Sequence, residues 1–204
     1  MALKKIPYGK TFLLIKHYLS AEEEAGAAQL IRRLRGVRTR GYLTPTELEA
    51  VCRWKSARAI QQIKRNSYSQ VRGATRRALA TRSERRRLEE LITLHGVSVP
   101  MASAILMLCD PVRYGVIDIR VWQLLHAAGA VSKKPRGVGF NFNNWYQFLM
   151  IIRYFSKKVG VTARNIERTL FLAHKDHQRG PLYSRGNSLL PRVPLRYLPE
   201  SRMM

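Results

Sequence analysis

Apolar residues recur three or four positions apart along most of this chain, and no segment alternates apolar and polar residues convincingly enough for a β-strand. We therefore expect an all-α fold. The compact helical domain should span residues 1–177, and a basic tail with several prolines and arginines should follow over 178–204. The spacing predicts helices over residues 10–19, 21–34, 44–54, 56–66, 67–79, 83–94, 100–109, 118–128, 141–159 and 162–177.

Helix-capping residues fix several of these boundaries. Thr44, Pro45 and Glu47 combine an N-cap, a proline at the first helical position and a carboxylate three residues beyond the cap. Gly160 should end one helix, and Thr162 should start the next. Gly36 and Gly41 should enclose a basic loop. The tail carries neither helical nor alternating spacing, so it is either disordered or an extended strap on the domain or on DNA.

The charge indicates the partner more strongly than any other bulk property. The 204 residues include 37 Lys and Arg against 13 Asp and Glu, a formal net charge of +24. Such an imbalance opposes compaction by self-repulsion and points to a polyanion, of which nucleic acid is the obvious example. Ribosomal proteins share this balance, so charge alone does not indicate an enzyme. The 46% of hydrophobic residues are sufficient for a core.

Cysteine usage and hydropathy narrow the class further. Cys52 and Cys109 lie in apolar helical patterns and should be buried free thiols. Two cysteines cannot form a four-cysteine iron–sulfur site, and no zinc-binding pattern is present. We see no signal peptide and no segment long enough to span a membrane, so we expect no membrane partner and a cytoplasmic protein, nucleoid-associated if bacterial.

The stretch from Leu94 to Trp122 carries the candidate chemistry. Gly96 allows a tight turn, Pro100 suits a first helical turn, and Ser98 can cap that helix or leave room for a close backbone approach. Such a turn directs backbone N–H groups at one point, which suits a phosphate. Asp118 follows inside the apolar run 115–119, where a carboxylate is costly unless it is bonded or used.

These residues resemble the helix-hairpin-helix DNA glycosylases, the base-excision repair enzymes. The hairpin would span residues 88–109, and the helix of the catalytic aspartate 117–128. Pro100 and Asp118 are 18 positions apart, the separation that the family uses between its hairpin residue and its catalytic aspartate. Ser98 replaces the second hairpin glycine. The residues that fit the pattern are Leu94, Gly96, Val97, Ala102, Ile105, Asp118, Val121 and Trp122.

The resemblance implies a monofunctional glycosylase that flips a base out of duplex DNA and hydrolyses its glycosidic bond, leaving an abasic site. Asp118 would stabilise positive charge on the sugar and activate a water. Pro100 stands where bifunctional members carry a Schiff-base lysine, so lyase chemistry is not expected. No cofactor is expected, although the hairpin could hold a monovalent cation, and the protein should be a monomer.

The remaining candidates bind DNA or the flipped base. Lys55, beside Trp54 at a helix end, is interpreted as a phosphate contact. The tryptophans fit core positions at helical spacing as well as they fit a base pocket. The candidates for phosphate binding are Gly96, Val97, Ser98, Val99, Lys55 and Arg120, and those for the base pocket are Trp54, Trp122, Trp145 and Tyr146.

Three alternatives remain open. Asp118 could simply cap the following helix. The protein could be a noncatalytic helix-hairpin-helix DNA-binding protein, or a basic ribosome-associated protein without any cleft. If it is a glycosylase, its missing iron–sulfur cysteines and hairpin lysine leave two substrates: an alkylated purine, in DNA repair, or a hypermodified pyrimidine of phage DNA, in phage defence.

Overall fold

The computed structural model describes residues 8–178 and 182, and in this part of the chain every regular element is a helix, as predicted. The helices are α1 (Gly9–Tyr18), α2 (Ala25–Leu34), α3 (Val37–Arg40), α4 (Pro45–Ser56), a 3₁₀ turn η1 (Ala57–Ala59), α5 (Ile60–Ile63), α6 (Tyr68–Ala80), α7 (Glu84–Ile92), α8 (Val99–Cys109), α9 (Ile119–Ala127), α10 (Phe142–Val159) and α11 (Ala163–His177). The predicted tail over 178–204 lies outside the described residues except for Gln178 and Leu182.

The helix starts follow the capping residues. Thr44 and Thr162 each form a reciprocal capping box, and Gly160 ends α10 with a left-handed backbone, φ 77°. Three predictions fail locally. The helix expected over 21–34 begins only at Ala25, because the Glu24 side chain caps it by accepting hydrogen bonds from the Gly26 N and the Ala27 N. The expected loop after Gly36 contains the short helix α3, because Val37 is buried there and Gly41 caps it at φ 81°. The helix expected over 56–66 is split into η1 and α5.

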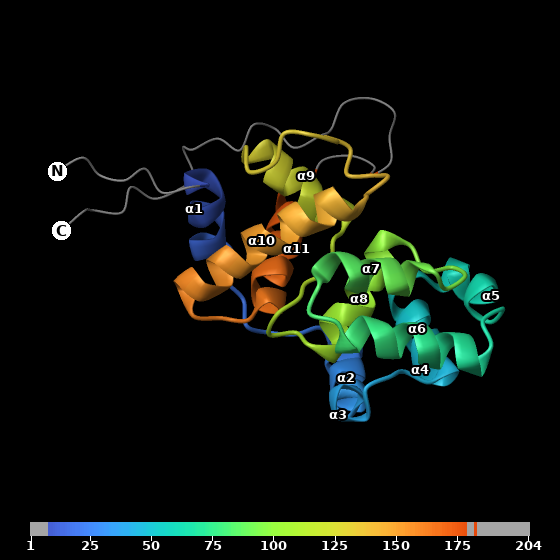
Figure 1. The fold of residues 1–204 in the computed structure, drawn as a ribbon. Coiled ribbons are helices and arrows are strands. Elements are labelled where there is room, and N and C mark those ends of the chain that lie inside the picture. The colour runs from blue at the N-terminus through green and yellow to red at the C-terminus, as the bar shows by residue number, and fades with distance from the viewer. Residues whose placement is uncertain (1–7, 179–181, 183–204) are drawn as a thin grey trace.

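The helices form two groups (Figure 1). Helices α1, α9 and α10 pack on α11, while α2, α4, α6, α7 and α8 pack on one another. Helix α10 contacts both α7 and α8 and so joins the groups. The segment after α8, which leads to α9, crosses from one group to the other.

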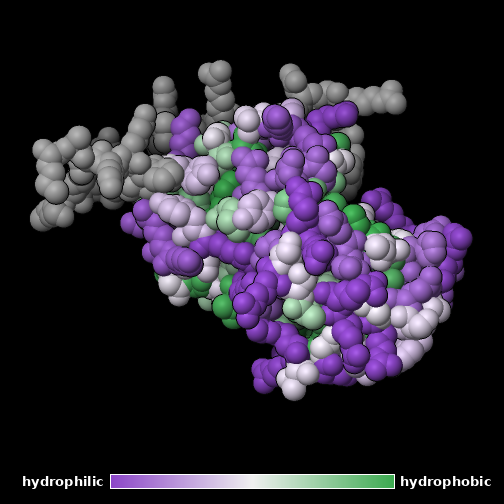
Figure 2. All heavy atoms as spheres, in the orientation of Figure 1, coloured by the Kyte–Doolittle hydropathy of each residue, from purple (hydrophilic) through white to green (hydrophobic). Residues whose placement is uncertain are grey.

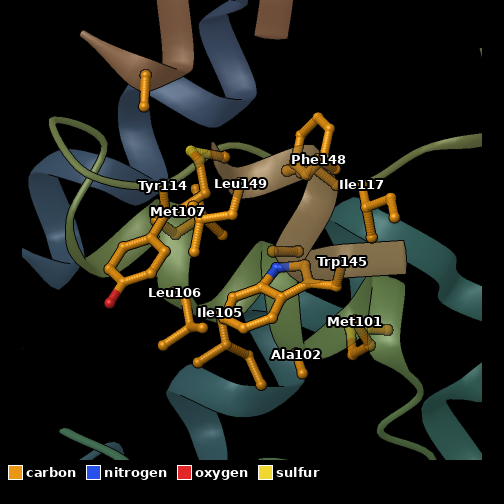
Figure 3. Close-up of a cluster of buried hydrophobic side chains, with 14 of the residues drawn as sticks. Met101, Ala102, Ile105, Leu106, Met107, Tyr114, Ile117, Trp145, Phe148 and Leu149 are labelled. Carbon is orange, nitrogen blue, oxygen red and sulfur yellow. The ribbon is translucent and has the colours of Figure 1, made fainter. Parts of the chain in front are cut away.

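Helix α8 is the centre of the core, because every residue from Met101 to Cys109 is buried. A helix that is apolar on all sides must be covered on all sides. Trp145 of α10 lies against this helix beside Met101, Ala102 and Ile105 (Figure 3). Cys52 and Cys109 are buried free cysteines, as predicted, and burial raises the pKa of Cys109 to about 12. Within the described residues, no helix is long and apolar enough to cross a membrane.

The packing of α9 on α11 buries a histidine that should make stability depend on pH. His174 is 1% exposed, its Nε2 lies 3.0 Å from the Gln123 Oε1, and its Nδ1 has no hydrogen-bond partner in the part of the chain that the structure describes. Burial, together with the charge of Arg120, lowers the pKa of His174 from 6.5 to about 4. The unfolded chain therefore takes up this proton more readily than the folded chain, so stability is lost as pH falls from 6.5 towards 4.

Between pH 7 and pH 5 we expect the free energy of unfolding to fall by about 2 kcal/mol through this residue. Urea denaturation at several pH values measures the slope. In His174→Gln the slope over this range should be much flatter. An unchanged slope would assign the pH dependence to other groups.

Candidate active site

Asp118 caps α9 and is also the centre of the candidate site. Its Oδ1 accepts a hydrogen bond from the Arg120 backbone N at 2.9 Å, and its Oδ2 accepts one from the Lys55 Nζ at 3.0 Å. The side chains of Asp118 and Lys55 are each 18% exposed. The carboxylate is therefore held on both oxygens and still reaches solvent.

The extended segment before Asp118 is fixed to both helix groups. The Ile117 N donates to the Ser103 Oγ on α8 at 3.1 Å, and the Val116 N donates to the Glu167 Oε2 on α11 at 3.3 Å. A Cβ on Gly115 would lie 2.7 Å from the Glu167 Cβ, so only glycine allows this close approach. These contacts place Asp118 where the two helix groups meet.

A cavity of about 480 Å³ opens beside Asp118, within the range typical of small-molecule sites. Of the residues that the structure describes, two line it with aromatic rings, Trp54 from α4 and Phe171 from α11. The Trp54 Nε1 donates to the Glu24 Oε2 at 3.1 Å, which fixes the indole. Among the described residues, the lining consists of Glu24, Trp54, Lys55, Val116, Asp118, Ile119, Arg120, Arg164, Glu167, Arg168, Phe171 and Leu182.

The α11 side of the cavity rests on a buried ionic network. Arg164, 7% exposed, bonds Glu167 and also Glu23, whose Oε2 lies 2.7 Å from its Nε. Burial raises the pKa of Glu167 against the opposing charge of Arg164. Burial also tends to raise the pKa of Glu23, but the hydrogen bond and charge of Arg164 outweigh it, and the pKa of Glu23 is lowered.

The turn between α7 and α8 is a separate feature. Gly96 has φ 78°, and a Cβ there would lie 2.9 Å from the Gln62 Cβ and 3.1 Å from the Ile63 N, so this position requires glycine. Val97 is buried, while Ser98 is exposed and makes no side-chain capping bond to α8. Of the two roles predicted for Ser98, capping is not observed.

Asn66 holds this turn in place. Its Oδ1 accepts from the His95 N at 2.8 Å, and its Nδ2 donates to the His95 O at 3.0 Å. We expect Asn66→Ala to lower the free energy of unfolding by about 1–3 kcal/mol, because it leaves these backbone groups unpaired. Urea denaturation measures the change. The exposed Asn143→Ala should stay within about 0.5 kcal/mol of wild type, and an equal effect of the two variants would contradict the role given to Asn66.

The predicted phosphate-binding residues lie in two places. Gly96, Val97, Ser98 and Val99 form the turn and the first residue of α8. Lys55 and Arg120 instead line the cavity, with Lys55 against Asp118 and the Arg120 guanidinium 5.6 Å from the centre of the Phe171 ring.

The structure corrects most of the predicted base pocket. Of the four candidates, Trp54 lines the cavity. Trp122 and Trp145 are fully buried core residues with 0% exposure, so they cannot stack on a ligand. Tyr146 is 41% exposed but lies outside the cavity lining and stacks on Phe142 with ring centres 5.4 Å apart.

The face of α11 that lines the cavity was not predicted from the sequence. Arg164, Glu167, Arg168 and Phe171 follow the three- and four-residue spacing of a single helix face. That spacing was readable, and its mixture of charged and aromatic residues separates it from an ordinary apolar face. Nothing in the sequence indicated that this face would meet Asp118.

Three further observations concern the surface of the molecule, metal binding and similarity to known proteins. Hydrophilic residues cover most of the face seen in Figure 2. No three His, Cys, Asp or Glu side chains of residues 8–178 and 182 gather in a way that could hold a metal ion. Comparisons with known protein families, with curated proteins and with solved structures give no match to this chain.

Proposed function

We propose that this protein is a DNA glycosylase that removes a damaged or enzymatically modified base from duplex DNA. One observation carries the proposal: the carboxylate of Asp118 lies in a cavity that also holds the rings of Trp54 and Phe171. A residue that served only as a helix cap would not need a cavity with aromatic walls beside it.

In the proposed reaction, Asp118 acts by stabilising positive charge on the sugar. As the C1′–N bond breaks, positive charge develops on the deoxyribose, as in other glycosyl transfers. A fixed carboxylate next to C1′ stabilises that charge, and it is most effective where its position is already set before reaction. The hydrogen bond from the Arg120 N to Oδ1 sets the position of Asp118.

The cavity walls suit a flipped base. A base outside the stack needs aromatic surfaces for its faces and polar groups for its edge. Trp54 and Phe171 would provide the surfaces, while Glu24 and Arg168 lie in the same lining and would meet polar groups of the base. The net charge of +24 and the exposed turn at Ser98 would hold the DNA backbone.

A panel of duplexes tests the proposal. Each duplex carries one modified base, including alkylated purines and hypermodified pyrimidines. After incubation, hot alkali cleaves the strand at abasic sites, and mass spectrometry detects the released base. We expect release from at least one duplex.

The second candidate is a noncatalytic DNA-binding protein, favoured by the capping bond from the Arg120 N to Asp118. Tight binding of every duplex without release of any base would support that alternative and contradict the glycosylase proposal.

The aromatic walls give a more specific prediction. Trp54→Ala and Phe171→Ala should each weaken binding of the duplex that carries the excised base by about 5- to 150-fold, since stacking on one base contributes about 1–3 kcal/mol. Both are measured in an Asp118→Asn background, so that binding is not followed by cleavage. Binding of unmodified duplex should change little.

Tyr146→Ala is the matched control, because it removes an exposed aromatic ring outside the cavity. If all three variants weaken binding of modified and unmodified duplex equally, the cavity does not receive the base.

A further inference from the structure

The partner of Asp118 is an amine. Lys55 reaches the carboxylate from the last turn of α4, and its Nζ lies 3.0 Å from Oδ2. Among the described residues that line the cavity, Lys55 is the single lysine. A water that attacked C1′ under the control of Oδ2 would have to share this oxygen with the lysine.

We propose that Lys55 acts as a nucleophile on the sugar and gives the protein a DNA strand-cleaving lyase activity, in addition to base excision. This inference rests on the proposed function for its substrate, the abasic site, whose open-chain sugar carries an aldehyde at C1′. Lysine amines form Schiff bases with carbonyl groups. Position 100, where the sequence resemblance would place such a lysine, holds proline.

The steps balance without any oxidant or reductant. The Lys55 ammonium passes one proton to Oδ2 along their hydrogen bond, and the freed nitrogen lone pair forms a bond to C1′. The aldehyde oxygen takes up the proton from Asp118, and the bonded nitrogen releases a second proton to solvent. The resulting hydroxyl takes up one proton from solvent and leaves as water, which produces the protonated Schiff base.

Loss of a proton from C2′ to a base or water then breaks the C3′–O bond by β-elimination, and the 3′ phosphate leaves with the downstream strand. Water hydrolyses the imine, which releases an unsaturated aldehyde and regenerates Lys55. The carboxylate acts as a proton carrier at short range, as efficient proton transfer requires.

The local structure supports a reacting role over a purely structural one. A surface ion pair contributes little to stability and needs no cavity. Lys55 and Asp118 instead come from segments 63 positions apart and meet where the two helix groups join. The indole of Trp54, the residue before Lys55, is held by Glu24, which restricts the end of α4 from which the lysine extends.

Reductive trapping tests the proposal. The full-length protein is incubated with a duplex that carries one abasic site, made by excising uracil, in the presence of sodium borohydride. Hydride reduces the Schiff base to a stable secondary amine, so we expect a covalent protein–DNA adduct. Without borohydride we expect strand cleavage at the abasic site.

Trypsin locates the adduct. Because a modified lysine is not cleaved, the adduct should lie on the peptide from Trp54 to Arg58, between the cleavage sites after Arg53 and Arg58. An adduct on another lysine or on the N-terminal amine would overturn the proposal.

Two variants of Lys55 test whether this residue acts as a nucleophile or only forms an ion pair with Asp118. Lys55→Arg keeps a cation that can bond Asp118 but should lose trapping and strand cleavage by at least 100-fold. Lys55→Gln should lose them as well. Lys10→Gln, at an exposed lysine of α1, should keep both activities at the wild-type level. Wild-type trapping by Lys55→Arg would overturn the proposal.

The abasic substrate keeps the two proposals distinguishable. Base release without trapping would leave the glycosylase proposal intact and overturn the lyase. Trapping on Lys55 without release of any base would support the lyase and overturn the glycosylase.

Discussion

Asp118→Asn should slow base release by about 1,000-fold, the scale of effect expected when a preorganised charge or a positioned acid–base group is removed from a transition state. Asparagine is nearly isosteric and remains a good N-cap, so α9 should still form. The measurement is single-turnover release of free base from whichever duplex the wild type processes. Affinity for the duplex should change little, since the loss is in the transition state.

Asp176→Asn is the matched control, because Asp176 is an exposed aspartate near the end of α11. It should release base at the wild-type rate. A wild-type rate in Asp118→Asn would remove Asp118 from the chemistry and leave it as a helix cap alone.

Arg164→Met should produce the largest loss of stability that we expect from a charged residue. Arg164 is buried and bonds Glu167, which is 2% exposed, as well as Glu23. Removing one partner of a buried ion pair costs about 3–5 kcal/mol, because the remaining charge is left without compensation. The free energy of unfolding in urea measures this loss.

Two further variants make this result specific. Arg53→Met removes an arginine that is 59% exposed and pairs with Glu49 one turn away, and it should cost less than about 1 kcal/mol. Adding Glu167→Gln to Arg164→Met should recover part of the stability, because no unpaired charge then remains at position 167. An Arg164→Met variant as stable as Arg53→Met would contradict the network.

The network also positions the candidate site. The Glu167 Oε2 accepts a hydrogen bond from the backbone N of Val116, two residues before Asp118. Loosening of Glu167 should free this segment and misplace the carboxylate. Arg164→Met should therefore lower the rate of base release as well as stability.

The helices could be predicted from the sequence because their boundaries depend on local chemistry. The capping boxes at Thr44 and Thr162 involve residues three positions apart, so a short window contains all the information. The predicted helix over 56–66 is split where the chain packs against a distant segment: a Cβ on Gly96, 33 positions after Ile63, would lie 3.1 Å from the Ile63 N.

The candidate site was only partly predictable, for a similar reason. Asp118 stood out as a carboxylate in an apolar run, and the structure gives it a capping bond and a place in a cavity. The tryptophans could not be assigned to the core or to the pocket, since an aromatic residue at helical spacing fits both equally well. The pairing of Lys55 with Asp118 depends on how the two helix groups dock, which no local pattern contains.

Binding of a charged abasic analogue tests the central claim most directly, because it does not require the identity of the base. A duplex with a pyrrolidine in place of one deoxyribose carries positive charge near C1′ and mimics the transition state, while a tetrahydrofuran duplex has the same shape without the charge. We predict that the wild type binds the pyrrolidine duplex at least about tenfold more tightly, and that Asp118→Asn loses this preference. Equal affinity of the wild type for the two duplexes, or an unchanged preference in Asp118→Asn, would contradict the account.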